Sequence, residues 1–161
     1  MNIYISGTSR GIGEALGKYY KENGDKVFGI ARSPKNIDIN QIECDLTQYD
    51  EMKIKIKEQL KDIKSLDLII LNAGILGDIN LLKESDMNDM KRTMEVNLWS
   101  QKVLLDLLLE YKPKTVIAIS SGAAIKGSPG WSGYSLSKAA LNMLVQLYAS
   151  EVNETKFIAL A

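Results

Sequence analysis

Short apolar runs alternate along this chain with longer amphipathic segments. The runs predict six strands, at residues 3–5, 25–30, 41–44, 66–71, 116–119 and 156–161. The segments between them predict helices at 14–23, at 48–63, at 85–111 with a break near 91–93, and from about residue 134 onward. Strands that alternate with helices predict an α/β fold built on a doubly wound parallel sheet.

Two details of the predicted helices carry further expectations. Thr47 and Asp50 have the spacing of a capping box at the start of the helix 48–63. Residues 103–109 are apolar on nearly every side of their helix. That pattern predicts burial against the sheet and also against another subunit.

Composition narrows the classes of protein to be considered. The 161 residues are enough for one domain with a real core, and 20 basic residues balance 20 acidic ones. A balanced charge gives no reason to expect nucleic acid as a partner. The sequence has no membrane-length apolar run, and Met1 leads directly into a strand, so we expect neither a membrane span nor a signal peptide. The single cysteine, Cys44, fits a reducing cytoplasm and is predicted to be a small core residue.

The chain contains no histidine. This excludes Ser-His-Asp and Cys-His triads and the zinc sites that histidine pairs form. With only one cysteine, a structural zinc site is excluded as well, so no metal is expected. Acid–base chemistry must therefore come from Tyr, Lys, Asp or Glu.

A glycine-rich turn, Ser6–Gly13, separates the first strand from the first helix. Gly7 permits a tight turn, while Gly11 and Gly13 allow close approach to the start of the helix. Free N–H groups and the helix dipole at that point favour a pyrophosphate, which indicates a dinucleotide site. The alternative is that the glycines serve only tight packing.

The end of the second strand should meet the adenosine ribose of a bound dinucleotide. That segment has no carboxylate, but it contains Arg32, and Arg10 in the glycine turn can reach the same place. Two arginines favour a 2′-phosphate, hence NADP, with NAD the less favoured cofactor. The alternative is that Arg32 is an ordinary surface arginine.

Two further strand ends carry candidate cofactor contacts. Asp45 follows the third strand and lies either beside an adenine pocket or in an ordinary loop. The fourth strand is closed by Asn72-Ala73-Gly74, where the glycine lets a cofactor lie against the backbone.

The segment Thr115–Lys138 combines a buried strand, hydroxyl groups at its end, a glycine-rich loop and a new helix. Tyr134 and Lys138 are four residues apart, so they share one helix face at the carboxyl edge of the sheet. A neighbouring ammonium favours the phenolate form of a tyrosine, and a serine hydroxyl can hold a carbonyl oxygen. Alone, such a pair is most often an ordinary surface pair on an amphipathic helix. Asn97 lies within the long helix and is either a structural link or part of the site.

Six motifs together resemble the short-chain dehydrogenase/reductase family over the whole chain. They are SGTSRGIG (Ser6–Gly13), CDL (Cys44–Leu46), NAG (Asn72–Gly74), Asn97, ISSGAA (Ile119–Ala124) and YSLSKAAL (Tyr134–Leu141). The resemblance implies a Rossmann-like sheet of order 3-2-1-4-5-6 and one NAD(P)-binding domain over 1–161. It also implies an NADP-dependent oxidoreductase that reduces a small ketone, aldehyde or dicarbonyl.

The family pattern implies Asn97, Ser121, Tyr134 and Lys138 as catalytic residues. Ser121 is preferred to Ser120 because it stands thirteen residues before the tyrosine. Ser121 would hold the substrate carbonyl and Tyr134 would protonate it. Lys138 would favour ionisation of the tyrosine and hold the ribose, and Asn97 would position a water. The implied cofactor contacts are Gly7, Ser9, Arg10, Gly11, Ile12, Gly13, Arg32, Asp45, Leu46, Asn72, Ala73, Gly74, Tyr134 and Lys138.

Two features refine this resemblance. Trp131, three residues before the tyrosine, is similar to the pattern of sepiapterin reductases and benzil reductases, which implies a small carbonyl or dicarbonyl substrate. We also expect a homodimer or homotetramer, formed through the helices near 93–111 and 134–151.

One departure from the family leaves two functions open. The sequence ends with the expected sixth strand, without the substrate lid and seventh strand of the family, which should leave an edge or face of the sheet open. The chain is therefore either an active reductase or an inactive remnant that binds nucleotide or a partner. An extended-type sugar epimerase or dehydratase is disfavoured by the glycine spacing and the short chain.

Overall fold

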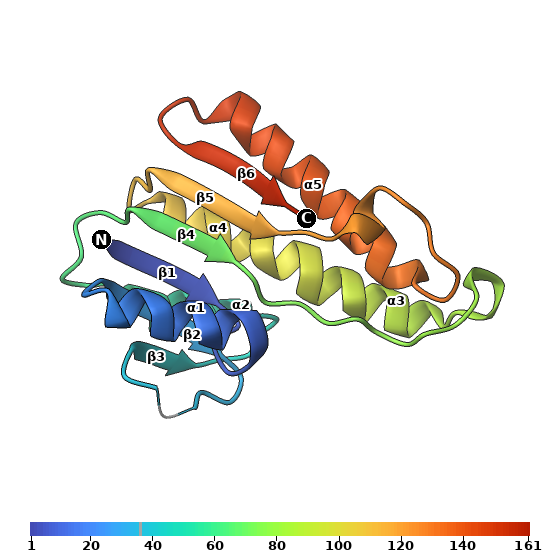
Figure 1. Ribbon diagram of the computed structural model, residues 1–161, viewed down its shortest axis with the longest axis horizontal. Helices are drawn as coiled ribbons and strands as arrows, with labels where there is room; N and C mark the ends of the chain where they lie inside the picture. The colour runs from blue at the N-terminus through green and yellow to red at the C-terminus, as the bar shows by residue number, and fades with distance from the viewer. Residues whose placement is uncertain (36) are drawn as a thin grey trace.

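The computed structural model describes residues 1–35 and 37–161, which form a six-stranded parallel sheet with helices on both faces (Figure 1). The strands are β1 (Asn2–Ser6), β2 (Lys26–Ala31), β3 (Asn40–Glu43), β4 (Leu68–Leu71), β5 (Thr115–Ile119) and β6 (Lys156–Leu160). Their order in the sheet is β3-β2-β1-β4-β5-β6. This confirms the predicted Rossmann-like sheet and its strand order.

The helices divide unequally between the two faces. They are α1 (Gly11–Glu22), α2 (Tyr49–Gln59), α3 (Met87–Met94), α4 (Ser100–Leu109) and α5 (Ser132–Glu151), with short 3₁₀ helices η1 (Leu82–Glu84) and η3 (Gly122–Ala124). A π-helical turn, η2 (Glu95–Trp99), joins α3 to α4. Helix α1 lies on one face, in front of the sheet in Figure 1, and α2, α4 and α5 pack on the opposite face. Helix α3 packs against α5 beyond the carboxyl ends of the strands.

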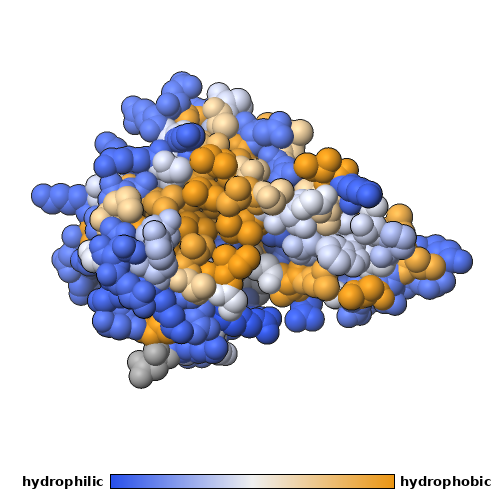
Figure 2. Space-filling model, viewed as in Figure 1, coloured by the Kyte–Doolittle hydropathy of each residue, from blue (hydrophilic) through white to orange (hydrophobic). Residues whose placement is uncertain are grey.

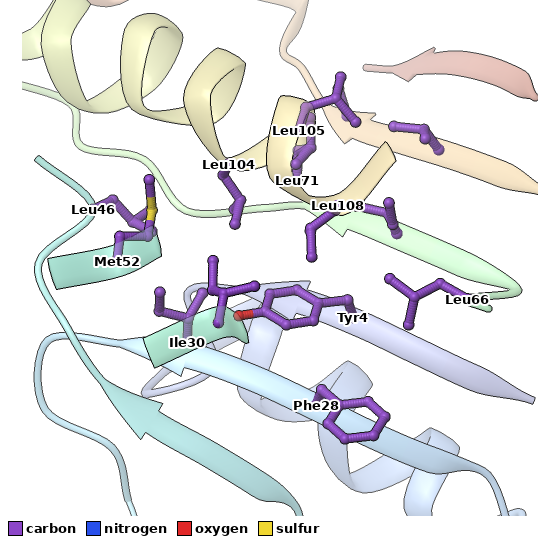
Figure 3. Packing of buried hydrophobic residues seen from close by; sticks show 14 of the residues in the cluster. Tyr4, Phe28, Ile30, Leu46, Met52, Leu66, Leu71, Leu104, Leu105 and Leu108 are labelled. Atoms are coloured by element: carbon purple, nitrogen blue, oxygen red, sulfur yellow. The ribbon is translucent and has the colours of Figure 1, made fainter. Parts of the chain in front are cut away.

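The main core fills the space between the sheet and α2, α4 and α5. Tyr4 and Phe28 on the sheet meet Met52 of α2 and Leu104 and Leu108 of α4, all essentially inaccessible to solvent (Figure 3). Residues 103–109 are predicted to be buried on two sides, against the sheet and against another subunit. Within this chain, only the side that faces the sheet is fully buried. Leu104, Leu105 and Leu108 are buried, whereas Val103, Leu107 and Leu109 are partly exposed.

On the opposite face, α1 covers β1 and β2 more fully than β5 and β6. Ile3, Ile5 and Val27 are buried beneath Leu16 and Tyr20 of α1. Across the sheet, Ile117 is paired in register with Ile158, and Ile119 with Leu160. Leu160 is 54% exposed. Figure 2 shows apolar side chains gathered at the centre of this face. The sheet therefore presents a partly open apolar surface beside its β6 edge.

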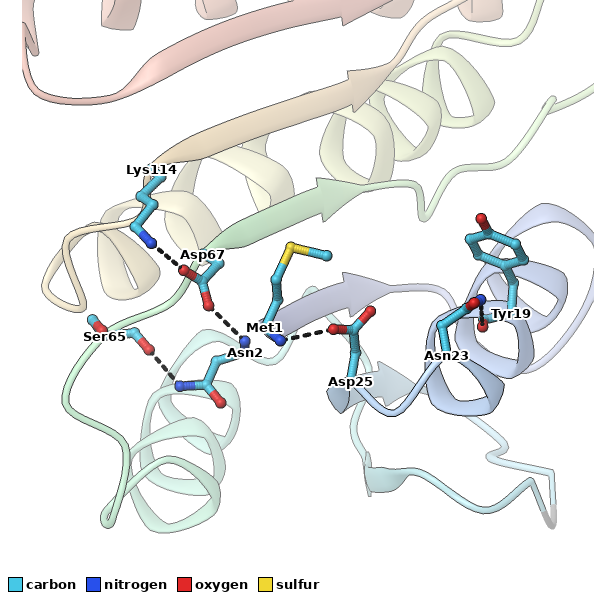
Figure 4. Close-up of polar contacts among 8 residues, drawn as sticks. All are labelled: Met1, Asn2, Tyr19, Asn23, Asp25, Ser65, Asp67 and Lys114. Atoms are coloured by element: carbon cyan, nitrogen blue, oxygen red, sulfur yellow. Dashed lines mark hydrogen bonds and ion pairs between the residues drawn. The ribbon is translucent and has the colours of Figure 1, made fainter.

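Polar contacts tie down the strands at the amino-terminal edge of the sheet (Figure 4). The N-terminal ammonium of Met1 pairs with Asp25 at 2.7 Å, and the Asn2 amide donates to Asp67 at 2.8 Å. Lys114 also donates to Asp67, at 2.6 Å, and these contacts lower the pKa of that carboxyl group. The start of β1 is thus held to the turns before β2, β4 and β5.

Two local predictions are wrong. The capping box does not form, because the Thr47 amide and hydroxyl both donate to Asp45 at 2.9 Å in a turn that ends before the helix. The break in the long helix lies at Glu95–Trp99 rather than near 91–93, and it is a widened π turn. Within the described ranges 1–35 and 37–161, no helix is long and apolar enough to cross a membrane.

Candidate active site

The glycine turn packs directly against the end of β4. Gly7 has a φ of +78°, and a Cβ atom there would lie 2.9 Å from the Ala73 Cα. The Ser6 hydroxyl accepts hydrogen bonds from the Asn72 and Ala73 amides, both at 3.0 Å. A side chain at residue 7 would separate the two turns, so glycine is needed there.

A cavity of about 360 Å³ opens beside these two turns, at the carboxyl ends of the strands. The predicted cofactor residues that line it are Gly7, Ser9, Arg10, Gly11, Ile12, Arg32, Asp45, Leu46, Asn72, Ala73 and Gly74. Gly13, Tyr134 and Lys138 do not line it. Residues missing from the prediction also contribute, namely Ile30, Ala31, Cys44, Ile75 and Val96. All of these lie in or next to a predicted motif or residue, since Ile30 and Ala31 precede Arg32, Cys44 begins the CDL motif, Ile75 follows Gly74, and Val96 precedes Asn97.

The two predicted arginines face this cavity from different elements. Arg10 precedes α1 and Arg32 follows β2, and both are exposed. Among the residues that the structure describes, neither arginine forms an ion pair with a carboxylate. Their guanidinium groups are thus available to an anion at this end of the cavity.

Asn97 is fully buried in the π turn and links two other parts of the site. Its carbonyl oxygen accepts from the Ile75 amide at 2.7 Å. Its NH₂ group donates to the Ile75 carbonyl at 2.8 Å and to the Ser137 hydroxyl at 2.9 Å. The Ser137 hydroxyl in turn donates to the Tyr134 carbonyl at 2.7 Å. Asn97 therefore joins the segment after β4 to the helix that carries Tyr134, and sequence reasoning missed Ser137.

Lys138 belongs to α5 and is 4% exposed. Its side chain reaches the end of β5. Its ammonium donates to the Ile119 carbonyl at 2.7 Å. Burial lowers the pKa of Lys138 from its ordinary value of 10.5 to about 8. The buried ammonium needs hydrogen-bond acceptors, and the Ile119 carbonyl takes only one of its three N–H donors. Two donors remain for other acceptors placed nearby.

Tyr134 and Ser121 complete the predicted group. The Lys138 ammonium lies 5.7 Å from the centre of the Tyr134 ring, and the Trp131 ring meets that tyrosine edge-to-face with ring centres 5.8 Å apart. The Ser121 hydroxyl is partly accessible and accepts from the Ala123 amide at 3.2 Å. By contrast, Ser120 is buried and donates to Asn142 at 2.5 Å. The geometry supports Ser121 over Ser120 as the hydroxyl available to a substrate.

Gly74 connects the cavity to this second group of residues. It lines the cavity, and a Cβ atom there would lie 3.2 Å from the Asn97 carbonyl oxygen and 3.6 Å from the Lys138 ammonium. A ligand that lies along Gly74 would reach the amine of Lys138 and the helix of Tyr134. Within the described part of the chain, no group of three His, Cys, Asp or Glu side chains could hold a metal ion.

The depressed pKa of Lys138 predicts a pH-dependent difference between wild type and Lys138→Met. Between about pH 8 and pH 10.5 the unfolded chain binds more protons at this position than the folded chain. The stability of the wild type relative to the variant should therefore rise with pH across that window, by up to about 3 kcal/mol.

Urea unfolding of both proteins at a series of pH values measures this difference. All other titrating groups are common to the two proteins, so their contributions cancel to first order. A difference in unfolding free energy that stays constant across the window would contradict the burial of the ammonium.

Comparisons with known proteins agree with the fold and the motifs. The family described as short chain dehydrogenase matches residues 1–161. An uncharacterized oxidoreductase of Schizosaccharomyces pombe is 31% identical, over 98% of this chain and 68% of that protein. A benzil reductase ((S)-benzoin forming) of Saccharomyces cerevisiae is 34% identical, over 92% of this chain and 65% of its own length. A benzil reductase ((S)-benzoin forming) of Bacillus subtilis is 30% identical, over 94% of this chain and 68% of that protein.

Solved structures give the same result. The KRED1-Pglu enzyme superposes with a TM-score of 0.91 at 29% identity, over 100% of this chain and 73% of that chain. A short chain dehydrogenase/reductase from Saccharomyces cerevisiae has a TM-score of 0.91 at 28% identity, over 99% of this chain and 69% of that chain. This chain thus spans about two thirds of the length of the relatives it matches. On its sequence and its fold, the chain belongs to the short chain dehydrogenase family.

Proposed function

We propose that this protein binds NADPH in the cavity at the strand ends and reduces a small ketone, aldehyde or dicarbonyl to an alcohol. The observation that carries this proposal is the meeting of the cavity with Asn97 and Lys138 at Gly74. Ligands of open α/β sheets bind at this edge, and here the same edge holds the tyrosine helix. The family to which the chain belongs is one of oxidoreductases that bind nicotinamide cofactors.

The lining of the cavity fits a phosphorylated dinucleotide. The backbone of the glycine turn and the start of α1 suit the pyrophosphate, since free N–H groups and the helix dipole meet there. Arg10 and Arg32 suit a 2′-phosphate on the adenosine ribose. Asp45 and Leu46 line the part of the cavity beside β3 and suit the adenine.

The proposed mechanism gives each of the predicted catalytic residues one role. Bound NADPH supplies a hydride to the carbonyl carbon. Ser121 donates a hydrogen bond to the carbonyl oxygen, and Tyr134 gives that oxygen its proton, so that an alcohol is formed. Lys138 stabilises the resulting phenolate and binds the nicotinamide ribose. Asn97 holds Ile75 and Ser137 in place and thereby fixes the tyrosine helix relative to the cofactor cavity.

Two observations support a dicarbonyl as the substrate class. Two of the relatives are named benzil reductases. In this chain Trp131 is 38% exposed and meets Tyr134 edge-to-face, so it offers an aromatic wall beside the proposed proton donor. A diketone with flat aromatic groups would pack against that wall.

Assembly and location are proposals of the same kind. Helix α5 exposes Leu136, Met143 and Leu147, which share one face and would be covered in the proposed homodimer or homotetramer. Free, buried Cys44 is in keeping with a reducing compartment such as the cytoplasm. We propose 1–161 to act as one nucleotide-binding domain.

Titration of the purified chain with NADPH and NADH tests the proposal, followed by turnover of benzil with the preferred cofactor. We expect NADPH to bind more tightly and benzil to be reduced. Binding of NADPH without turnover of any small carbonyl would favour the alternative of an inactive nucleotide-binding remnant. A folded chain that binds neither cofactor would contradict the proposed site.

Replacing Arg32 with Asp should reverse part of the cofactor preference. The change removes a cation that faces the cavity and puts an acceptor where a ribose 2′-hydroxyl would lie. We expect the ratio of NADPH affinity to NADH affinity to fall at least about 10-fold, because a charge-assisted hydrogen bond is lost.

Arg92→Asp is the matched control, since Arg92 is an exposed arginine of α3 that does not line the cavity. It makes the same change in net charge and should leave the ratio within about twofold. Equal ratios for the two variants would remove Arg32 from the 2′-phosphate site.

A further inference from the structure

The hydroxyl of Thr8, inside the glycine turn, is turned away from the cavity towards β3. Thr8 is fully buried, and its hydroxyl donates to the side-chain carbonyl of Gln41 at 2.7 Å. The NH₂ group of Gln41 then donates to the Lys35 carbonyl at 2.8 Å. We call this pair of hydrogen bonds the Thr8–Gln41 bridge. It connects the glycine turn to the segment Arg32–Lys35 that follows β2.

The orientation of the Gln41 amide in this bridge is fixed by its partners. The Lys35 carbonyl can only accept, so the NH₂ group must face it and the amide oxygen must face Thr8. The Thr8 hydroxyl then has to donate. Each member of the bridge therefore has a single role, and loss of either side chain breaks the connection.

The Thr8–Gln41 bridge crosses strand β2 at Gly29, where the absence of a side chain leaves room for it. Gly29 of β2 is paired in register with Gln41 of β3 and with Ile5 of β1. A Cβ atom at Gly29 would lie 2.7 Å from the Thr8 hydroxyl oxygen and 3.2 Å from the Gln41 Cγ. The glycine thus leaves the space through which Thr8 reaches across β2 to β3.

A second contact holds the same segment from the other side. The Lys35 ammonium pairs with Glu14 of α1 at 3.0 Å, and Glu14 also pairs with Lys18 at 2.7 Å. Lys35 is therefore held through its carbonyl by Gln41 and through its ammonium by α1. The exposed ion pair alone would contribute little, which leaves the bridge as the more specific connection.

We propose that Thr8 and Gln41 are positioning residues that hold Arg32–Lys35 against the glycine turn and so set the affinity for the 2′-phosphate of NADP. The inference rests on the cofactor proposed above. Arg10 stands two residues after Thr8, and Arg32 stands three residues before Lys35. Fixing Thr8 to Lys35 thus fixes the two backbone segments that carry the arginines, and a preorganised pair of cations binds a phosphate more tightly than a mobile pair.

Calorimetric titration with two adenosine nucleotides tests the bridge without relying on catalysis. The ligand 2′,5′-ADP carries the 2′-phosphate, and 5′-AMP lacks it. For Thr8→Val and Gln41→Leu we expect 2′,5′-ADP to bind about 10-fold more weakly and 5′-AMP to change by less than about twofold. Thr8→Ser keeps the hydroxyl and should keep the wild-type preference.

Two further proteins make the test specific. Thr155→Val removes another buried threonine hydroxyl, which donates to the Pro113 carbonyl at 2.7 Å beside β6, and should leave both affinities unchanged. In an Arg32→Ala background, Thr8→Val should cause a smaller further loss for 2′,5′-ADP than it does in the wild type, because only Arg10 is then left to be positioned. Thermal unfolding of each variant confirms that the titrated protein is folded.

The outcomes separate this inference from the proposed function. If the wild type prefers 2′,5′-ADP and the bridge variants keep that preference, the bridge has no role in selecting the cofactor, although the NADP site stands. Equal weakening of both nucleotides would also overturn the inference, because it indicates general damage to the turn. A wild type that binds the two nucleotides equally would overturn both the proposed NADP preference and the role of the bridge.

Discussion

Replacing Tyr134 with Phe is expected to lower the turnover of a carbonyl substrate about 1,000-fold, which is within the usual range for removal of a positioned acid. NADPH affinity should change by less than about twofold, because Tyr134 does not line the cavity proposed for the dinucleotide. The fold should be unaffected, since the phenyl ring keeps its edge-to-face contact with Trp131. Steady-state turnover of benzil and a fluorescence titration with NADPH measure the two effects.

Tyr148→Phe is the matched control for this substitution. Tyr148 lies on the same helix, and its hydroxyl donates to Asp106 at the surface of α4. Its removal should reduce stability by about 1 kcal/mol and leave turnover unchanged. Near-wild-type turnover by Tyr134→Phe, or an equal loss in both variants, would show that Tyr134 is not the proton donor.

The parts of the fold that could be predicted are those set by local sequence. Buried parallel strands need continuous apolar runs, and Leu68–Leu71 and Thr115–Ile119 have them. The glycine turn could be located because glycine is the residue that tolerates a positive φ, and Gly7 adopts one. Strand order followed from the family resemblance, and the structure confirms it.

The parts that could not be predicted depend on contacts between distant segments. The π turn forms where Asn97 hydrogen-bonds both backbone groups of Ile75, which is 22 residues earlier in the chain. The capping box failed because Asp45 offered Thr47 a nearer partner. Gln41 lies in no motif, and Ser137 lies in the motif YSLSKAAL without a role of its own there. The hydrogen bonds of both residues form only when two distant segments meet. The catalytic roles themselves stay predictions, which the substitutions above address.

Replacing Gly13 with Ala is expected to disable the cofactor site and to weaken the fold together. A Cβ atom at Gly13 would lie 2.2 Å from the Gly7 carbonyl oxygen and 2.5 Å from the Asn72 NH₂ group. That NH₂ group donates to the Ser6 and Gly7 carbonyls, at 3.0 and 3.2 Å, so the added methyl group would push apart the two turns that form one wall of the cavity. We expect the free energy of unfolding to fall by about 2 to 3 kcal/mol. NADPH affinity should fall at least about 10-fold, because the pyrophosphate cradle is displaced.

Gly17→Ala provides the control within the same helix, four residues further on. A Cβ atom at Gly17 would meet only the ends of the Ile39 and Ile37 side chains, at 3.2 and 3.4 Å, and both can move. Alanine also favours the helix over glycine by up to about 1 kcal/mol, so this variant should be as stable as the wild type or more stable. Urea unfolding and NADPH titration of the two variants distinguish a defect at the turn from a general intolerance of α1 to side chains. If Gly13→Ala bound NADPH as the wild type does, the approach of α1 to Gly7 would not shape the binding site. The pyrophosphate would then have to be held elsewhere than at the start of that helix.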